Sequence, residues 1–369
     1  MGTAKLRKDD FPLFLGKLNT SHKVIGPRIE QDVIILDEIQ FSDIPAGMED
    51  HQKEGGYRLL RGDRLEIFSF SVGPDSFKRF LHPPVSEVHS FKRSGKGVTV
   101  APLTKEERPL AFLEMRACDL SALQLYDRIF LQGPVRDPEY ASLRKNSLVV
   151  TLNCLYPNAN CFCDSMGTGP EVKEGFDIAL TELSNSFLLE IRTGSGQMML
   201  DGLPTEEVTD SDMNEKRMRI QNCRTMIKKT IRSDDLPWLL RRNPDHPRWA
   251  AIAKRDLECG NCTQVCPTCF CSSTYDALRL SSFSRKAQDI SGVRMRKWDS
   301  CFSRNFARVH GGNFRPSRRA RYRHWISHKF AYTLEQFGIT GCVGCGRCIT
   351  WCPAGIDVTR ELEGLRNVQ

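Results

Sequence analysis

The feature that most constrains this chain is the grouping of its cysteines. Fifteen cysteines occur in 369 residues. Most of them fall into three short stretches: Cys154, Cys161 and Cys163; Cys259, Cys262, Cys266, Cys269 and Cys271; and Cys342, Cys345, Cys348 and Cys352. The first ten residues contain no apolar run, so we expect no signal peptide, a cytoplasmic location and reduced thiols. Reduced thiols bunched in this way usually bind metal.

Composition is that of a globular chain. Apolar residues make up 40% and charged residues 27%, which fits a protein with hydrophobic cores. No stretch approaches the roughly 18 consecutive apolar residues needed to cross a bilayer, so we expect no membrane association. At roughly 150 residues per domain, the length predicts two or three domains.

The C-terminal cysteines have the spacing of bacterial ferredoxins. Cys342-x2-Cys345-x2-Cys348-x3-Cys352 is followed by Pro353. In such a run, three thiolates hold one 4Fe–4S cluster and the fourth cysteine ligates a neighbouring cluster. Structural zinc is the alternative, but zinc sites usually pair two Cys-x2-Cys knuckles instead of crowding three ligands into one loop.

The middle group repeats this spacing with one substitution, because Asp256 stands where the first cysteine is expected. If the fourth ligands cross, one cluster takes Cys259, Cys262, Cys352 and position 256, and the other takes Cys342, Cys345, Cys348 and Cys266. A carboxylate is harder than a thiolate and matches cluster iron less well, but it can bind. Three alternatives stay open: Asp256 ligates iron, Asp256 lies beside a three-iron cluster, or Cys269 or Cys271 replaces it.

The sequence pattern predicts an α/β N-terminal domain, residues 1–235, followed by a helical two-cluster ferredoxin-like domain, residues 236–369. Predicted strands are Val33–Leu36, Leu65–Phe70, Leu110–Ala117, Leu148–Asn153, Phe176–Leu183 and Phe187–Arg192. Asp119 is the expected N-cap of a helix that ends at Gly133. In the second domain, one amphipathic helix is predicted from Ser317 to Phe337, ending at Gly338.

The first domain offers a third candidate cluster site. Its ligands would be Cys118, Cys154, Cys161 and Cys163. Cys118 and Cys154 each follow a predicted strand, and ligands gather at the carboxyl ends of strands in open α/β sheets. Cys118 also precedes a helix, whose N-terminus stabilises a thiolate. Gly167 and Gly169 are candidate cofactor-binding residues that could point N–H groups at cluster sulfides. Unrelated buried thiols, or zinc, are the alternatives.

Much of the net charge of +8 lies between Ser300 and Leu334, a stretch without acidic residues. By itself such a stretch suggests nucleic-acid binding. Its position between two cysteine runs favours compensation of negatively charged clusters and contact with a partner chain, so we expect no nucleic acid. A solvated helix face is the other alternative. No GxxxxGK[ST] or GxGxxG motif occurs, so flavin and nicotinamide are expected on a partner chain.

Longer motifs span residues 116–353. They are RACDL at 116–120, CFCDSMGTGP at 161–170, CGNC at 259–262, CPTCFC at 266–271, WDSC at 298–301, GGNFRP at 311–316 and GCVGCGRC at 341–348. In these motifs the chain resembles the beta, iron–sulfur subunit of cytosolic NADP-linked nickel–iron hydrogenases, or sulfhydrogenases. It is similar, more distantly, to an iron–sulfur component of anaerobic sulfite reductase. Asp256 departs from the cysteine usual in the family, and Cys301 has no assigned role.

The resemblance implies a member of an oxidoreductase complex that carries electrons and has no catalytic centre of its own. It would connect a flavin subunit that reacts with NAD(P)H to the small and large subunits of a nickel–iron hydrogenase. Service to an anaerobic sulfite reductase is one alternative. An iron–sulfur protein that binds nucleic acid is an alternative of another class.

Overall fold

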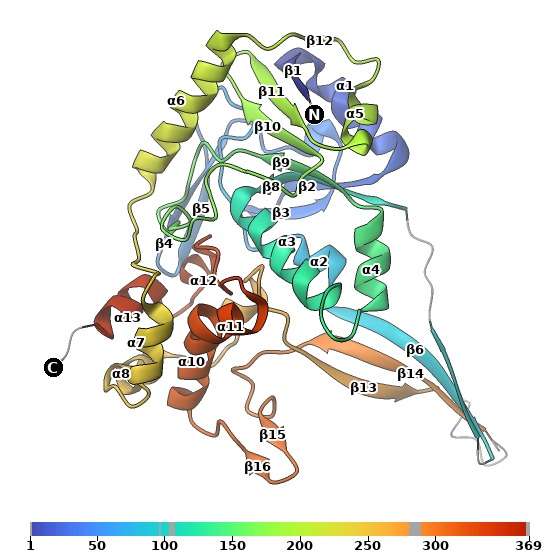
Figure 1. Ribbon diagram of the computed structural model, residues 1–369, viewed down its shortest axis with the longest axis vertical. Coiled ribbons are helices and arrows are strands. Elements are labelled where there is room, and N and C mark those ends of the chain that lie inside the picture. The colour runs from blue at the N-terminus through green and yellow to red at the C-terminus, as the bar shows by residue number, and fades with distance from the viewer. Residues whose placement is uncertain (1, 96, 103–107, 280–288, 367–369) are drawn as a thin grey trace.

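The computed structural model describes residues 2–95, 97–102, 108–279 and 289–366. Figure 1 shows a large sheet flanked by helices, a long β-arm and a group of short C-terminal helices. Cysteines lie in or directly beside each of these three parts. Within the described ranges, no helix is both long enough and apolar enough to span a membrane.

An eight-stranded mixed sheet organises the N-terminal half, in the order β12-β1-β11-β10-β9-β8-β2-β3. Its strands are β1 (Gly2–Arg7), β2 (Lys23–Glu30), β3 (Val33–Glu38), β8 (Leu110–Arg116), β9 (Leu148–Leu152), β10 (Ile178–Glu182), β11 (Ser186–Ile191) and β12 (Thr205–Glu206). β8 is parallel to β2 and β9, and β9 is parallel to β10, so their carboxyl ends meet at one edge. Five of the six predicted strands are confirmed, with their ends shifted by a few residues.

Helices cover both faces of this sheet. They are α1 (Phe11–Ser21) and α5 (Gly194–Leu200) on one face, and α2 (Lys78–Leu81), α3 (Ala117–Phe130) and α4 (Pro138–Lys145) on the other. Smaller elements are the hairpins β4 (Met48–Lys53) with β5 (Gly56–Arg61) and β15 (Arg308–Val309) with β16 (Gly312–Asn313), and the short helices η1 (Lys8–Asp10) and η2 (Phe41–Asp43). The predicted α/β class of the N-terminal half is thus confirmed.

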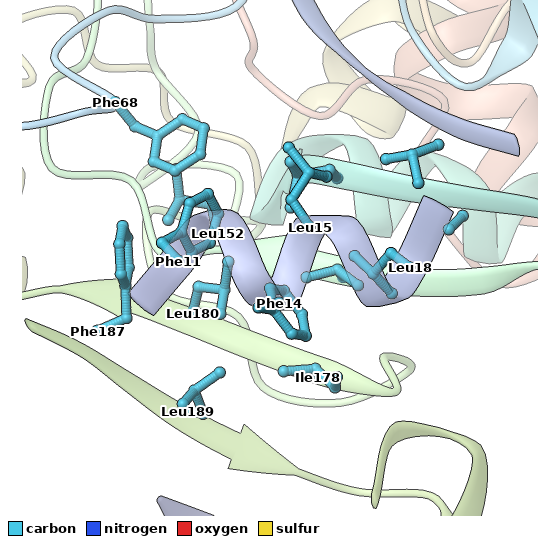
Figure 2. Packing of buried hydrophobic residues seen from close by; sticks show 14 of the residues in the cluster. Phe11, Phe14, Leu15, Leu18, Phe68, Leu152, Ile178, Leu180, Phe187 and Leu189 are labelled. Atoms are coloured by element: carbon cyan, nitrogen blue, oxygen red, sulfur yellow. The ribbon is translucent and has the colours of Figure 1, made fainter. Parts of the chain in front are cut away.

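Helix α1 anchors the core of one sheet face, although the sequence analysis did not predict it. Phe11, Phe14, Leu15 and Leu18 recur at helical spacing and are almost completely buried. Figure 2 shows them packed against strand residues such as Leu180. Burying each such side chain contributes about 1.5–3 kcal/mol relative to leaving it exposed.

The predicted strand at Leu65–Phe70 is wrong, because this segment is irregular. Glu182 on β10 accepts the backbone N–H groups of Ile67 at 2.7 Å and Phe68 at 3.0 Å. A carboxylate therefore satisfies backbone donors that a neighbouring strand would otherwise bind. The alternating apolar residues still serve the core, since Phe68 and Phe70 are buried.

A four-stranded antiparallel sheet forms the arm that projects from the body in Figure 1, in the order β13-β14-β6-β7. Its strands are β6 (Val85–Ser94), β7 (Gly97–Pro102), β13 (Ser272–Leu278) and β14 (Asp289–Trp298). β14 pairs with β6, so strands from both halves of the chain share one sheet. The description of the second domain as helical is therefore not confirmed, and the boundary at residue 236 stays a prediction.

Short helices gather around the C-terminal cysteines. They are α6 (Asp210–Met226), α7 (Leu236–Arg242), α8 (Arg248–Arg255), α9 (Asn261–Gln264), α10 (Arg318–Ser327), the π-helical η4 (His328–Tyr332), α11 (Thr333–Phe337), α12 (Arg347–Thr350) and α13 (Val358–Gly364). Trp249, Trp325 and Leu362 belong to the buried apolar core between them. The predicted helix from Ser317 is confirmed in its extent, because Ser317 caps it and Gly338, with φ +68°, ends it. A π-helical turn interrupts it at His328–Tyr332.

Candidate metal centres

The two ferredoxin-like runs meet at a cavity of about 450 Å³, here called the first cavity. Among the residues that line it are Asp256, Cys259, Cys262 and Cys352. Its walls include the aromatic side chains of Phe302, Tyr322 and Trp325. Cys352 thus faces the cysteines of the other run, which is the crossing that the spacing predicts.

Asp256 points an unsatisfied oxygen into the protein interior. The residue caps the C-terminus of α8 and is 8% exposed. Oδ1 accepts the backbone N–H of Glu258 at 3.0 Å, whereas Oδ2 is buried and has no partner among the described residues. Burial, the largest effect, raises the pKa of this carboxyl. Leaving a buried acceptor unpaired costs about 1–3 kcal/mol, so Oδ2 is suited to bind a cation such as cluster iron.

A second cavity of about 350 Å³ contains the other predicted ligand set. Cys266, Cys342, Cys345 and Cys348 all line it. Cys348 lines the first cavity as well, so the two cavities are adjacent. Within the described part of the chain, no three His, Cys, Asp or Glu side chains converge on a point that a single metal ion could occupy.

The loop of the second cavity depends on two glycines. Gly344 and Gly346 have φ values of +64° and +76°, which L-amino acids with side chains rarely adopt. A Cβ at Gly344 would lie 2.6 Å from the backbone nitrogen of Cys163, and one at Gly346 would lie 2.6 Å from backbone atoms of Asn160. Glycine thus allows the cysteine loop to lie directly against the N-terminal α/β part.

A buried ion pair holds the same loop to helix α3. Arg347 donates two hydrogen bonds to the carboxylate of Asp119, at 2.7 and 2.8 Å, and both side chains are buried. Asp119 was predicted to cap a helix ending at Gly133, but α3 begins at Ala117 and ends at Phe130. The carboxylate instead neutralises a guanidinium that comes from the cysteine loop.

The N-terminal thiols, Cys118, Cys154, Cys161 and Cys163, lie near one another. Cys118 lies in the first turn of α3 and Cys154 follows β9, the strand beside β8. The helix N-terminus was expected to stabilise a Cys118 thiolate, but this expectation is wrong for the thiol as it stands. Burial, followed by the nearby Asp119 carboxylate, raises its pKa well above the usual value.

Cys223 is a thiol that the sequence analysis left out of the site. It lies in α6, is fully buried and makes a hydrogen bond with Cys154. That bond, aided by the Arg116 guanidinium, lowers the pKa of Cys154. Its buried position on an otherwise polar helix could have been noticed, but its contact with Cys154 could not.

Arg116 and Glu114 form a strained charged pair beside Cys154. Glu114 has a φ of +71° at a bulge between β8 and β9, and its carboxylate accepts a hydrogen bond from Arg116. Arg116 is 1% exposed and also donates to the carbonyl of Phe70 at 2.8 Å. Backbone strain of this kind persists where the surroundings enforce it, commonly at functional sites.

The predicted glycine loop divides into two roles. The N–H of Gly167 donates to the carbonyl of Asp164 at 3.0 Å, so it closes a turn instead of pointing at a ligand. Gly169 packs against Cys163, since a Cβ there would lie 3.1 Å from Sγ. Cofactor binding by Gly169 stays a prediction.

The N-terminal thiols lie directly beside the second cavity. The N–H of Phe162 donates to the carbonyl of Gly344 at 2.8 Å, and the hydroxyl of Thr168 donates to the carbonyl of Val343 at 2.7 Å. Cys161 Sγ lies 3.8 Å from the carbonyl oxygen of Cys345. The three cysteine sites are therefore contiguous, with the second cavity in the middle.

The remaining cysteines form a separate group. Cys271 and Cys301 share a hydrogen bond, which lowers the pKa of Cys271, and Cys269 bonds with Cys266. None of Cys269, Cys271 and Cys301 lines the first cavity. Replacement of Asp256 by Cys269 or Cys271 is thus the less favoured of the earlier alternatives.

The basic stretch is partly bound within the protein. Arg321 forms an ion pair with Glu258 beside the first cavity, and Arg318 lies 3.6 Å from the same carboxylate. Arg319 and Arg323 lie near the exposed Asp245. Lys329 donates to a cysteine of the second cavity. These contacts favour the predicted electrostatic role near the cysteine sites.

Comparisons with known proteins agree with this geometry. Residues 255–356 match the family model described as a 4Fe-4S dicluster domain, so this region carries two 4Fe–4S clusters. The chain is 33% identical over 255 residues to sulfhydrogenase 2 subunit beta of Pyrococcus furiosus, covering 68% of this chain and 72% of that protein. No solved structure shows a significant match.

Proposed function

The chain belongs to the sulfhydrogenase beta-subunit family, and from this premise we propose that it is the electron-transfer subunit of a hydrogenase complex. It would pass electrons between a flavin subunit that reacts with NAD(P)H and a nickel–iron core of small and large subunits. The relative's name favours hydrogenase over sulfite reductase as the enzyme served. In this role the chain works in the cytoplasm and has no catalytic centre of its own.

One observation carries the proposal: two adjacent cavities receive cysteines that cross between the two runs. We assign Asp256, Cys259, Cys262 and Cys352 to one cluster, and Cys266, Cys342, Cys345 and Cys348 to the other. Bound 4Fe–4S clusters supply reversible one-electron transfer. The aromatic and aliphatic walls limit the access of water, and burial of this kind is one of the protein's means of setting a potential.

We further assign a third cluster to the N-terminal thiols. Cys154, Cys161 and Cys163 would supply three ligands, and Cys118 or Cys223 the fourth. The contacts of this group with the second cavity support a path in which the second site lies between the other two. The exposure of Cys259 favours the first site as one end of this path.

The number of clusters can be tested on anaerobically purified protein. Iron and sulfide analysis should give about twelve irons per chain with a third cluster and about eight without it. Cys118→Ser and Cys223→Ser should be compared, because the variant that loses about four irons identifies the fourth ligand. A colourless protein containing zinc would contradict the iron–sulfur assignment.

The electron-transfer role can be tested by visible absorbance, which falls when clusters are reduced. The chain alone should not be bleached by NADPH or by hydrogen. It should be bleached by NADPH once the flavin subunit is added, and by hydrogen once the hydrogenase subunits are added. Oxidation of NADPH or hydrogen by the isolated chain would contradict the proposal. A steep salt dependence of binding to DNA would favour the nucleic-acid alternative.

A further inference from the structure

Lys329 lies at the junction between the basic helix and the second cavity. It belongs to the π-helical turn η4, which interrupts the helix between α10 and α11. The residue is 5% exposed, and it lines the second cavity together with the four cysteines. Single π-turns within longer helices are frequent at functional sites.

The ammonium group of Lys329 is fully occupied. Nζ donates to Cys266 Sγ at 3.0 Å, to Thr268 Oγ1 at 2.9 Å and to the carbonyl of Gly341 at 3.1 Å. These three bonds use the three donors of an ammonium group. Their geometry orients the positive charge towards a sulfur atom that we assign as a cluster ligand.

The π-turn gives the backbone of Lys329 a second role in the same loop. Its carbonyl accepts the N–H of Gly341 at 2.8 Å, while its side chain binds the carbonyl of that glycine. Gly341 directly precedes Cys342, another ligand in the assignment. Lys329 therefore fixes both the start of the cysteine loop and the position of its own charge.

A buried ammonium needs an opposite charge nearby, because moving an unpaired charge out of water is costly. Within the described ranges, no carboxylate forms an ion pair with Lys329. The sulfur of Cys266 is the acceptor that can carry negative charge. The location of Lys329 is thus explained if Cys266 is held as a thiolate by a bound cluster.

The first cavity has the opposite electrostatic character. Its lining includes the carboxylate of Asp256 and no lysine, whereas the second cavity includes Lys329 and no carboxylate. A hydrogen bond and a positive charge at a ligand sulfur favour the reduced, more negative state of a cluster. A carboxylate ligand opposes that state.

We propose that Lys329 is a positioning residue that raises the reduction potential of the second centre above that of the first. This inference rests on the proposed function, since it requires both clusters. It also gives the relay a direction, because at equilibrium an electron shared by the two centres resides mainly beside Lys329. The second centre is then the local acceptor between the first centre and the N-terminal thiols.

The test is an anaerobic redox titration of the full chain, followed by electron paramagnetic resonance. Lys329→Met should lower the reduced fraction of one centre at least tenfold at a fixed ambient potential, equivalent to about 59 mV for one electron. Lys329→Arg should keep most of the wild-type value. Arg319→Met is the matched control, since it removes an exposed cation from the adjacent helix α10 and should shift neither centre.

Full iron content with unchanged potentials in Lys329→Met would overturn the role of Lys329. Should that variant lose iron, Lys329→Gln decides in its place, because it keeps a donor and removes the charge. A lowered potential in it supports the inference, and an unchanged one overturns it. Wild-type protein with fewer than two titrating clusters would instead contradict the proposed function.

Discussion

At the scale of single residues, three charged side chains distinguish the cysteine sites from a simple set of thiols. Asp256 brings an unpaired carboxylate oxygen to the first cavity. Lys329 and Arg347 bring buried positive charges to the second cavity and its loop. Because burial strengthens electrostatic interactions, each of these groups should have a measurable effect when it is changed.

Asp256 is expected to be the weakest ligand of the first centre. Asp256→Ala should convert that centre to a three-iron form even under anaerobic handling, because the cavity then lacks its fourth ligand. Asp256→Cys should give a four-thiolate cluster with a shifted potential. Electron paramagnetic resonance and iron analysis distinguish these forms. Asp245→Ala is the control, since Asp245 is exposed, and wild-type spectra in Asp256→Ala would exclude the carboxylate as a ligand.

The Asp119–Arg347 pair should be important for stability. Asp119→Ala leaves a buried guanidinium without its partner, which typically costs about 3–5 kcal/mol. Urea unfolding of the iron-loaded protein should show a clearly lower midpoint. The matched control is Asp276→Ala, which breaks a similar two-bond pair with Arg294 on the exposed arm and should change little. Equal midpoints for the two variants would show that the buried pair is not needed.

At the scale of elements, the glycine loop of the second cavity has little room for change. Gly346→Ala places a Cβ 2.6 Å from the backbone of Asn160 and strains a left-handed residue. We expect this variant to bind about four fewer irons, which is the content of one cluster. Gly311→Ala is the control, because no atom lies within 4 Å of the added carbon and its backbone conformation is ordinary. Wild-type iron content in Gly346→Ala would show that the loop can move.

The cysteine pattern was the most predictable element because its chemistry depends on spacing along the chain. The crossing of Cys266 and Cys352 between the runs followed from that spacing, and the cavities contain those residues. The strands β8 and β9 were also predictable, since each is a short, completely buried apolar run. Local sequence determines such features.

Long-range contacts could not be predicted in the same way. The pairing of β14 with β6 joins segments that are far apart in sequence, and neither strand indicates its partner. The contact of Cys223 with Cys154 has the same cause. Asp119 was misassigned because a helix cap and a buried ion-pair partner call for the same residue type, and Arg347 lies far away along the chain.

At the scale of the whole molecule, iron and fold should depend on each other. Ligand thiols and Lys329 are buried together, so removal of iron leaves groups in the core that no longer have their partners. The iron-free chain should melt at a lower temperature, by about 2–4 °C for each kcal/mol lost. Limited proteolysis should then cut first within residues 255–356, the matched region. Reloading with iron and sulfide is the control, and identical melting with and without iron would contradict this coupling.

The shared arm sheet has a consequence for the order of events during synthesis. β6 and β7 leave the ribosome early, but β14, which pairs with β6, follows only after most of the chain has been made. Until then β6 presents an open edge, which is a template for pairing with other chains. Cys271 and Cys301 flank the late strands, so the C-terminal cysteines come together only as that edge closes. Cluster insertion should therefore be a post-translational step, and nascent chains that stall before β14 should be the ones that need a chaperone.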